Sequence, residues 1–125
     1  MFCRIYLCIK AGDSDLCTQQ LAAVINAQII GERYIEKDGL LLEIRLNEDR
    51  DIQKAKEFPN GFLHFPYSIE IEAEHFSTHQ TSVVDDLNKI LNYLWDTNNS
   101  AVASCAFENL LVKGGGYKRR DIPWC

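Results

Sequence analysis

Two histidines are spaced as metal ligands on a helix would be. His75 and His79 lie four residues apart and directly follow Glu74. On a helix this spacing places both imidazoles on one face, as zinc sites require. The sequence marks no third ligand nearby. We therefore predict no metal, no cofactor and no catalytic residues, and we interpret both histidines as surface residues that precede a helix.

His64 stands between Leu63 and Phe65 after a turn, a position typical of a structural histidine. Because imidazole titrates near neutral pH, a histidine beside a carboxylate is also a common general base. An alternative function therefore stays open: a small enzyme or ligand-binding domain whose pocket uses His64 or His75. No nucleophile motif such as Gly-x-Ser-x-Gly occurs, so we predict that the protein is not an enzyme.

The cysteines are odd in number and have no spacing typical of a disulfide framework; they are Cys3, Cys8, Cys17, Cys105 and Cys125. The start of the chain does not resemble a secretion signal, and no apolar run reaches the roughly 18 residues that span a membrane. Cytosolic reductants keep thiols reduced. We therefore predict five reduced thiols in a cytoplasmic protein.

Three glycines at 114–116 precede Lys118, Arg119 and Arg120. Glycine amides beside cations can hold phosphate, but the P-loop pattern is absent, so we expect an irregular basic tail over about 109–125. The whole chain has a net charge of -5. Its field repels phosphate backbones and anionic lipids, so we predict neither nucleic acid nor membrane as a partner.

An acidic window occupies the middle of the chain, where no lysine or arginine occurs between Lys56 and Lys89. A negative field favours a basic protein partner, because opposite charges steer the encounter and aromatic side chains anchor the complex. The residues predicted to bind such a partner are Glu70, Glu72, Glu74, Tyr67, Asp85 and Asp86. The alternative is a solvated sheet face followed by a helix N-terminus, whose dipole the two aspartates complement.

Hydrophobic periodicity predicts seven elements around these residues. Alternation at period two indicates strands at 2–10, 29–36, 40–46, 65–73 and 101–107, and helical spacing indicates helices at about 14–26 and 83–95. A turn with a helix cap at Asp13 or Ser14 precedes the first helix. The Asp38-Gly39 pair suits a tight hairpin. The predicted order is β-α-β-β-β-α-β.

A length of 125 residues leaves room for one domain, and a hydrophobic content of 46% can build a core. We predict a single α+β domain over 1–125, with a five-stranded, mainly antiparallel sheet and two helices packed on one face. The face opposite the helices would display Glu70, Glu72 and Glu74 beside Glu43, Arg45, Arg4 and Tyr6.

Three runs, LLEIRLNED at 41–49, FPYSIEIE at 65–72 and ASCAFE at 103–108, together with the length and the element order, resemble small bacterial immunity proteins. Such proteins accompany polymorphic toxins, including those of contact-dependent growth inhibition. The resemblance implies a cytoplasmic, non-enzymatic protein that binds one cognate toxin domain, often a basic nuclease. An acidic docking face suits this role, because a surface that holds phosphate is positive. A homodimer that pairs through the exposed sheet face is a further alternative.

Overall fold

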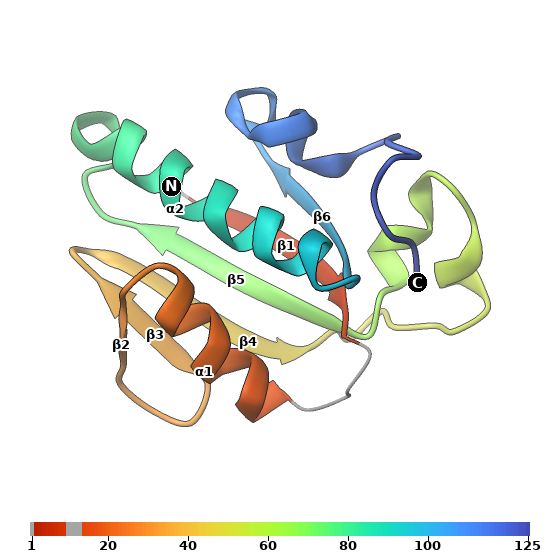
Figure 1. Ribbon diagram of the computed structural model, residues 1–125, viewed down its shortest axis with the longest axis horizontal. Coiled ribbons are helices and arrows are strands. Elements are labelled where there is room, and N and C mark those ends of the chain that lie inside the picture. Colours follow the sequence, from red (N-terminus) through yellow and green to blue (C-terminus); the bar gives the residue numbers. More distant parts are fainter. Residues whose placement is uncertain (1, 10–13) are drawn as a thin grey trace.

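The computed structural model describes residues 2–9 and 14–125 and has two layers, a sheet and a pair of long helices (Figure 1). The strands are β1 (Phe2–Cys8), β2 (Gln28–Ile29), β3 (Tyr34–Lys37), β4 (Leu40–Leu46), β5 (Tyr67–Ala73) and β6 (Ser100–Cys105). The helices are α1 (Ser14–Val24) and α2 (Phe76–Asp96). The turn and helix cap predicted around Asp13 lie outside the described residues.

The sheet has six strands in the order β2-β3-β4-β5-β1-β6, and every neighbouring pair is antiparallel. The α+β class, the antiparallel sheet and the two helices are confirmed, but the count of five strands and the order β-α-β-β-β-α-β are wrong. The predicted strand at 29–36 is a small hairpin, since the chain bends at Gly31 and the Ile30 N–H donates to the Tyr34 carbonyl at 3.1 Å. A glycine inside an apolar run is a usual mark of such a break.

The turn between β3 and β4 is the tight hairpin that the sequence predicts. Asp38 and Gly39 both have positive φ angles, 47° and 83°, which a two-residue hairpin loop requires. The turn fixes the register, so that Lys37 pairs with Leu40 and Glu36 with Leu41. Glu36 and Leu41 therefore share one face of the sheet with every second residue of both strands.

The core lies between one face of the sheet and the two helices, which cross that face side by side (Figure 1). The sheet contributes alternate residues that are fully buried, including Ile5, Leu42, Ile44, Ile69 and Ile71. The helices contribute Leu21, Leu87, Ile90 and Leu91, and Ile25 adds to the core just after α1 ends. Each side chain of this size stabilises the fold by roughly 1.5–3 kcal/mol when it leaves water.

Helix α2 begins at Phe76, earlier than the predicted start near Val83. After the half-buried Phe76, residues 77–82 are polar and exposed and carry no periodic apolar signal, and His79 interrupts the helix with non-helical angles. Within the described parts of the chain, no helix has both the length and the apolar character that crossing a membrane requires.

The predicted basic tail is anchored to the domain by buried residues such as Leu111 and Ile122, and it contains the short 3-10 helices η3 (Glu108–Leu110) and η4 (Val112–Gly116). Gly116 has a φ of +94°, and a Cβ there would lie 2.9 Å from the Trp95 ring. The glycine therefore allows close backbone approach. The guanidinium of Arg120 stacks over the Phe58 ring at 4.3 Å, so this cation is also used within the fold.

Candidate functional site

The sheet face that points away from the helices is covered at one end and bare at the other. Cross-strand pairing aligns Phe2 with Glu72 and Arg4 with Glu70 on this side, and β4 continues the rows. We call the bare part the open face. Its members alternate with the core residues and are exposed or half-buried: Phe2, Arg4, Tyr34, Glu36, Leu41, Glu43, Arg45, Glu70 and Glu72.

Glutamates outnumber cations on the open face, four against Arg4 and Arg45. Arg4 Nε lies 2.9 Å from both carboxylate oxygens of Glu70, and Arg4 Nη1 donates to the Tyr6 hydroxyl at 3.2 Å. These hydrogen bonds hold the pKa of Arg4 above its ordinary value, with that to Glu70 as the larger cause. Arg4 therefore stays charged and neutralises Glu70, while the other three glutamates give the face its negative charge.

Glu43 lies directly opposite Glu70 across β4 and β5. Like charges in this position repel each other, and Arg4 offsets the repulsion through its pair with Glu70. Tyr34 donates a hydrogen bond to Glu43, which raises the pKa of the tyrosine. A cation brought by a partner would therefore be favoured beside Glu43.

A shallow hollow of about 630 Å³ lies at the bare end of the face, where Phe2 and Leu41 supply apolar surface and Glu72 and Glu74 supply carboxylates. Phe2 is 51% exposed although it is a large apolar side chain. An apolar floor with an acidic rim suits a protein side chain that has an apolar stem and a cationic end, as lysine and arginine have.

The covered end of the same face is closed by five aromatic residues that we call the aromatic clasp. They come from residues 58–65 and from the tail: Phe58, Phe62, Phe65, Tyr117 and Trp124. Phe62 packs edge-on against Tyr6 of β1 at 5.5 Å between ring centroids. Tyr6 is consequently only 8% exposed, and this end of the sheet is closed to a partner.

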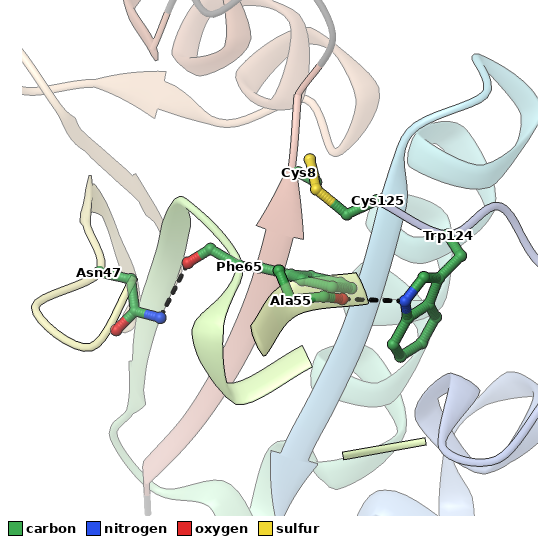
Figure 2. The surroundings of a disulfide bond; sticks show 6 residues. All are labelled: Cys8, Asn47, Ala55, Phe65, Trp124 and Cys125. Carbon is green, nitrogen blue, oxygen red and sulfur yellow. Dashed lines mark hydrogen bonds between the residues drawn. A yellow bond between two sulfur atoms is a disulfide. The ribbon is translucent and has the colours of Figure 1, made fainter. Parts of the chain in front are cut away.

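Trp124 connects the two segments of the aromatic clasp (Figure 2). Its ring packs edge-on against Phe65 at 5.1 Å, and its indole N–H donates to the Ala55 carbonyl at 2.9 Å. The buried Asn47 side chain donates to the Phe65 carbonyl at 2.8 Å from the other side. The tail is thereby tied to a loop about 60 positions earlier in the chain.

Cys8 and Cys125 form a disulfide beside this tryptophan (Figure 2). The prediction of five reduced thiols is therefore wrong for these two residues, while Cys3, Cys17 and Cys105 are thiols. The partners are 117 positions apart, so no local spacing marks them, and only the folding back of the tail brings them together. The expectation of a reducing cytoplasm loses the support that it drew from the cysteines.

The predicted acidic residues of β5 lie where the alternation places them. Glu70 and Glu72 are on the open face. Glu74 follows the end of β5 and is exposed, and its N–H donates to the Gly39 carbonyl at 3.0 Å. These three side chains therefore follow one line from the middle of the face to its bare end.

The other three predicted partner residues lie elsewhere, so the six do not form one surface. Tyr67 alternates with Glu70 and Glu72 and pairs with Leu7 and Leu46 on the helix side of the sheet. Asp85 and Asp86 belong to α2 over that same side. Asp86 is only 6% exposed and accepts a hydrogen bond from Lys37 at 3.0 Å, so it serves the packing of α2 on the hairpin.

The histidines are separated and have no shared site. His64 Nδ1 lies 2.8 Å from the Asp49 carbonyl, which fixes the ring in a turn. His75 borders the hollow beside Phe2, whereas His79 lines a second hollow between α2 and the β3–β4 hairpin. Among the described residues, no group of three or more histidine, cysteine or acidic side chains is placed to hold a metal ion.

Phe2, Leu41 and Glu36 belong to the open face but were not predicted as partner-binding residues. The Asp38-Gly39 turn could have revealed Glu36 and Leu41, because its register pairs these two residues. The alternation of Phe2 with Cys3 in β1 could have revealed Phe2. The assembled face offers negative charge around exposed apolar groups, which is a chemistry of binding. No protein family, curated protein or solved structure was found to match the chain.

Proposed function

We propose that this protein is an immunity-type inhibitor that binds a basic toxin domain through the open face. The observation that carries the proposal is the bare half of the sheet, where acidic residues surround the exposed Phe2 and the half-buried Leu41. A toxin domain that acts on nucleic acid carries positive charge where it holds phosphates. An acidic surface of this kind would compete for the same cations.

The charges and the apolar groups have separate tasks in this proposal. Glu36, Glu43 and Glu72 steer the encounter, because long-range attraction mainly raises the association rate. Phe2 and Leu41 hold the complex, since desolvated aromatic and apolar anchors dominate binding energy at interfaces. Glu70 is already paired with Arg4, so we expect a smaller contribution from its charge than from Glu43 or Glu72.

A second copy of this chain is a poorer occupant of the open face. In a symmetric dimer the same patch meets itself, so the excess glutamates of one copy would face those of the other. Juxtaposed like charges cost several kcal/mol at an interface. Sedimentation at increasing protein concentration checks this point, and a dimer lost on Phe2→Asp substitution would assign the face to self-association instead.

The proposal places the protein in the cytoplasm of the cell that it protects. Cytosolic thiols are kept reduced, so the fold must persist there with Cys8 and Cys125 unlinked. Trapping of thiols with a maleimide at the moment of lysis, followed by mass spectrometry, measures the state of this pair in cells.

The decisive experiment is co-expression with the product of the adjacent gene, scored by cell survival and by co-purification on a sizing column. We expect rescue and a stoichiometric complex. The double variant Glu43→Lys/Glu72→Lys should slow association about tenfold or more at low ionic strength and reduce its salt dependence.

The matched control is Asp85→Lys/Asp96→Lys, which changes the net charge by the same amount at two exposed positions of α2. It should leave association within about threefold of wild type, since these residues lie away from the open face and their charges are screened. Equal losses in both variants would assign the effect to the overall charge of the protein. Absence of both rescue and complex would overturn the proposal.

A further inference from the structure

Two of the cysteine thiols face each other across neighbouring strands. Cys3 of β1 is directly opposite Cys105 of β6, and both lie on the helix-covered side of the sheet together with Ile5 and Ala103. Opposite residues of antiparallel strands have Cα atoms about 4.5 or 5.5 Å apart. Disulfides form at Cα separations of about 4.4–6.8 Å, so the register alone places these residues within bonding range.

The two thiols differ in exposure and in acidity. Cys3 is fully buried, whereas Cys105 is partly exposed at the end of the edge strand. The side-chain hydrogen bond from Cys3 lowers the pKa of Cys105, and the same contact together with burial raises the pKa of Cys3. The charge of Glu108 opposes the shift at Cys105 and is a smaller cause. Cys105 is therefore the thiol that ionises first and that solvent reaches.

We propose that Cys105 is a peroxide-reactive thiol and that Cys3 is its resolving partner, so that oxidation links β1 to β6 by a second disulfide. A partly exposed thiol whose pKa is lowered and which lies next to a second cysteine is the arrangement that redox-sensing thiols share. The inference is independent of the open face and of any toxin partner, because both sulfurs lie on the other side of the sheet.

The oxidant is a hydroperoxide and the reaction has two steps. The Cys105 thiolate attacks one peroxide oxygen, the O–O bond breaks, and the departing oxygen takes a proton to leave as water or an alcohol. Cys105 is then a sulfenic acid. Cys3 attacks the sulfenic sulfur, the S–O bond breaks, and the hydroxyl leaves as water with the proton of Cys3. Two thiols thus lose two electrons and two protons, and the peroxide is reduced.

The test uses the full chain with its Cys8–Cys125 bond intact. The protein is treated with increasing hydrogen peroxide, freed of peroxide, denatured in the presence of the alkylating reagent and mapped by mass spectrometry. We expect a peptide pair linked through Cys3 and Cys105, with the thiol of the buried Cys17 still alkylated. A disulfide between Cys105 residues of two chains, or oxidation of Cys17 before Cys105, would overturn the proposal.

Three variants separate the roles. Cys3→Ala should abolish the linked peptide and leave a sulfenic acid on Cys105 that dimedone traps. Cys105→Ser should slow peroxide consumption on the order of tenfold or more, since the reactive thiolate is gone. Cys17→Ser should behave as wild type. Unchanged peroxide consumption in Cys105→Ser, or direct over-oxidation of Cys105 in wild type with Cys3 still reduced, would contradict the assignment.

Discussion

The two ends of β1 present side chains to the same face of the sheet and meet opposite surroundings. At one end Tyr6 is 8% exposed under Phe62, and at the other end Phe2 is 51% exposed although it is the more apolar residue. Hydrophobicity alone therefore does not decide which end is covered. The chain uses its aromatic clasp and its disulfide at one end and leaves the other end bare.

This difference separates residues that hold the fold from residues that are free to bind. The aromatic clasp joins segments about 60 to 70 positions apart through ring contacts and the Trp124 hydrogen bond. The bare end has Arg4–Glu70 as its ion pair on the face, and a partly exposed pair of this kind contributes roughly 0–1 kcal/mol. Substitutions should therefore unfold the protein at the covered end and spare its stability at the bare end.

The strongest test compares two phenylalanines. Phe65 is fully buried and packs against Trp124, so Phe65→Ala should lower the free energy of unfolding by about 3–5 kcal/mol through lost burial and a cavity. Phe2→Ala should cost about 1 kcal/mol or less, since the ring is half in water. Urea unfolding of both variants measures the difference. Equal losses would show that the bare end is as important to the fold as the aromatic clasp.

The disulfide should have the next largest effect. It constrains the unfolded chain over a separation of 117 residues, so Cys125→Ser should lower the free energy of unfolding by about 2–4 kcal/mol. Wild type unfolded in the presence of dithiothreitol should match the variant, because both lack the bond. Coincident unfolding curves for oxidised and reduced wild type would instead show that the Trp124 contacts hold the tail without it.

Local patterns in the sequence were sufficient to predict the parts of the fold that depend on neighbours. Alternation gave β4 and β5, and Asp38-Gly39 gave the hairpin between β3 and β4. The bend at Gly31 was missed because Ile29, Ile30 and Ile35 form an apparently continuous apolar strand. The aromatic clasp was missed for a different reason. Its contacts join residues 58–65 to the tail, and no periodicity reports on pairs so far apart.

The candidate site was predictable to the same extent. Parity along β5 gave Glu70 and Glu72 on one face, and the same parity puts Tyr67 on the opposite side of the sheet, so grouping it with these glutamates was wrong. Asp86 looked like a free surface charge. Its pairing with Lys37 follows from the packing of α2 on the hairpin, a contact between elements that are distant in sequence.

The smallest effect on stability is expected from Asp121, an exposed residue whose ion pairs help to hold the tail. Asp121 accepts hydrogen bonds from Arg119 at 2.8 and 2.9 Å and lies 3.0 Å from Lys113. These contacts, that with Arg119 first, hold the pKa of Asp121 below its ordinary range. A depressed pKa in the folded state adds stability above the unfolded value and loses it as pH falls toward the folded value. The advantage of wild type over Asp121→Asn should therefore be present at neutral pH and shrink below about pH 4, near the unfolded aspartate pKa.

Thermal unfolding of wild type and Asp121→Asn across this pH range measures the effect, and an Arg119→Gln background supplies the control. In that background the pH dependence of the difference should be smaller, because the main cause of the lowered pKa has been removed. The advantage of wild type over Asp121→Asn should also differ between disulfide-bonded and reduced protein, since the bond at Cys125 already restrains the tail when it is intact. If wild type were more stable than Asp121→Asn by the same amount at all pH values, Asp121 would act on the tail through its shape and not its charge. The covered end of the sheet would then be held by aromatic packing and the disulfide without help from charge.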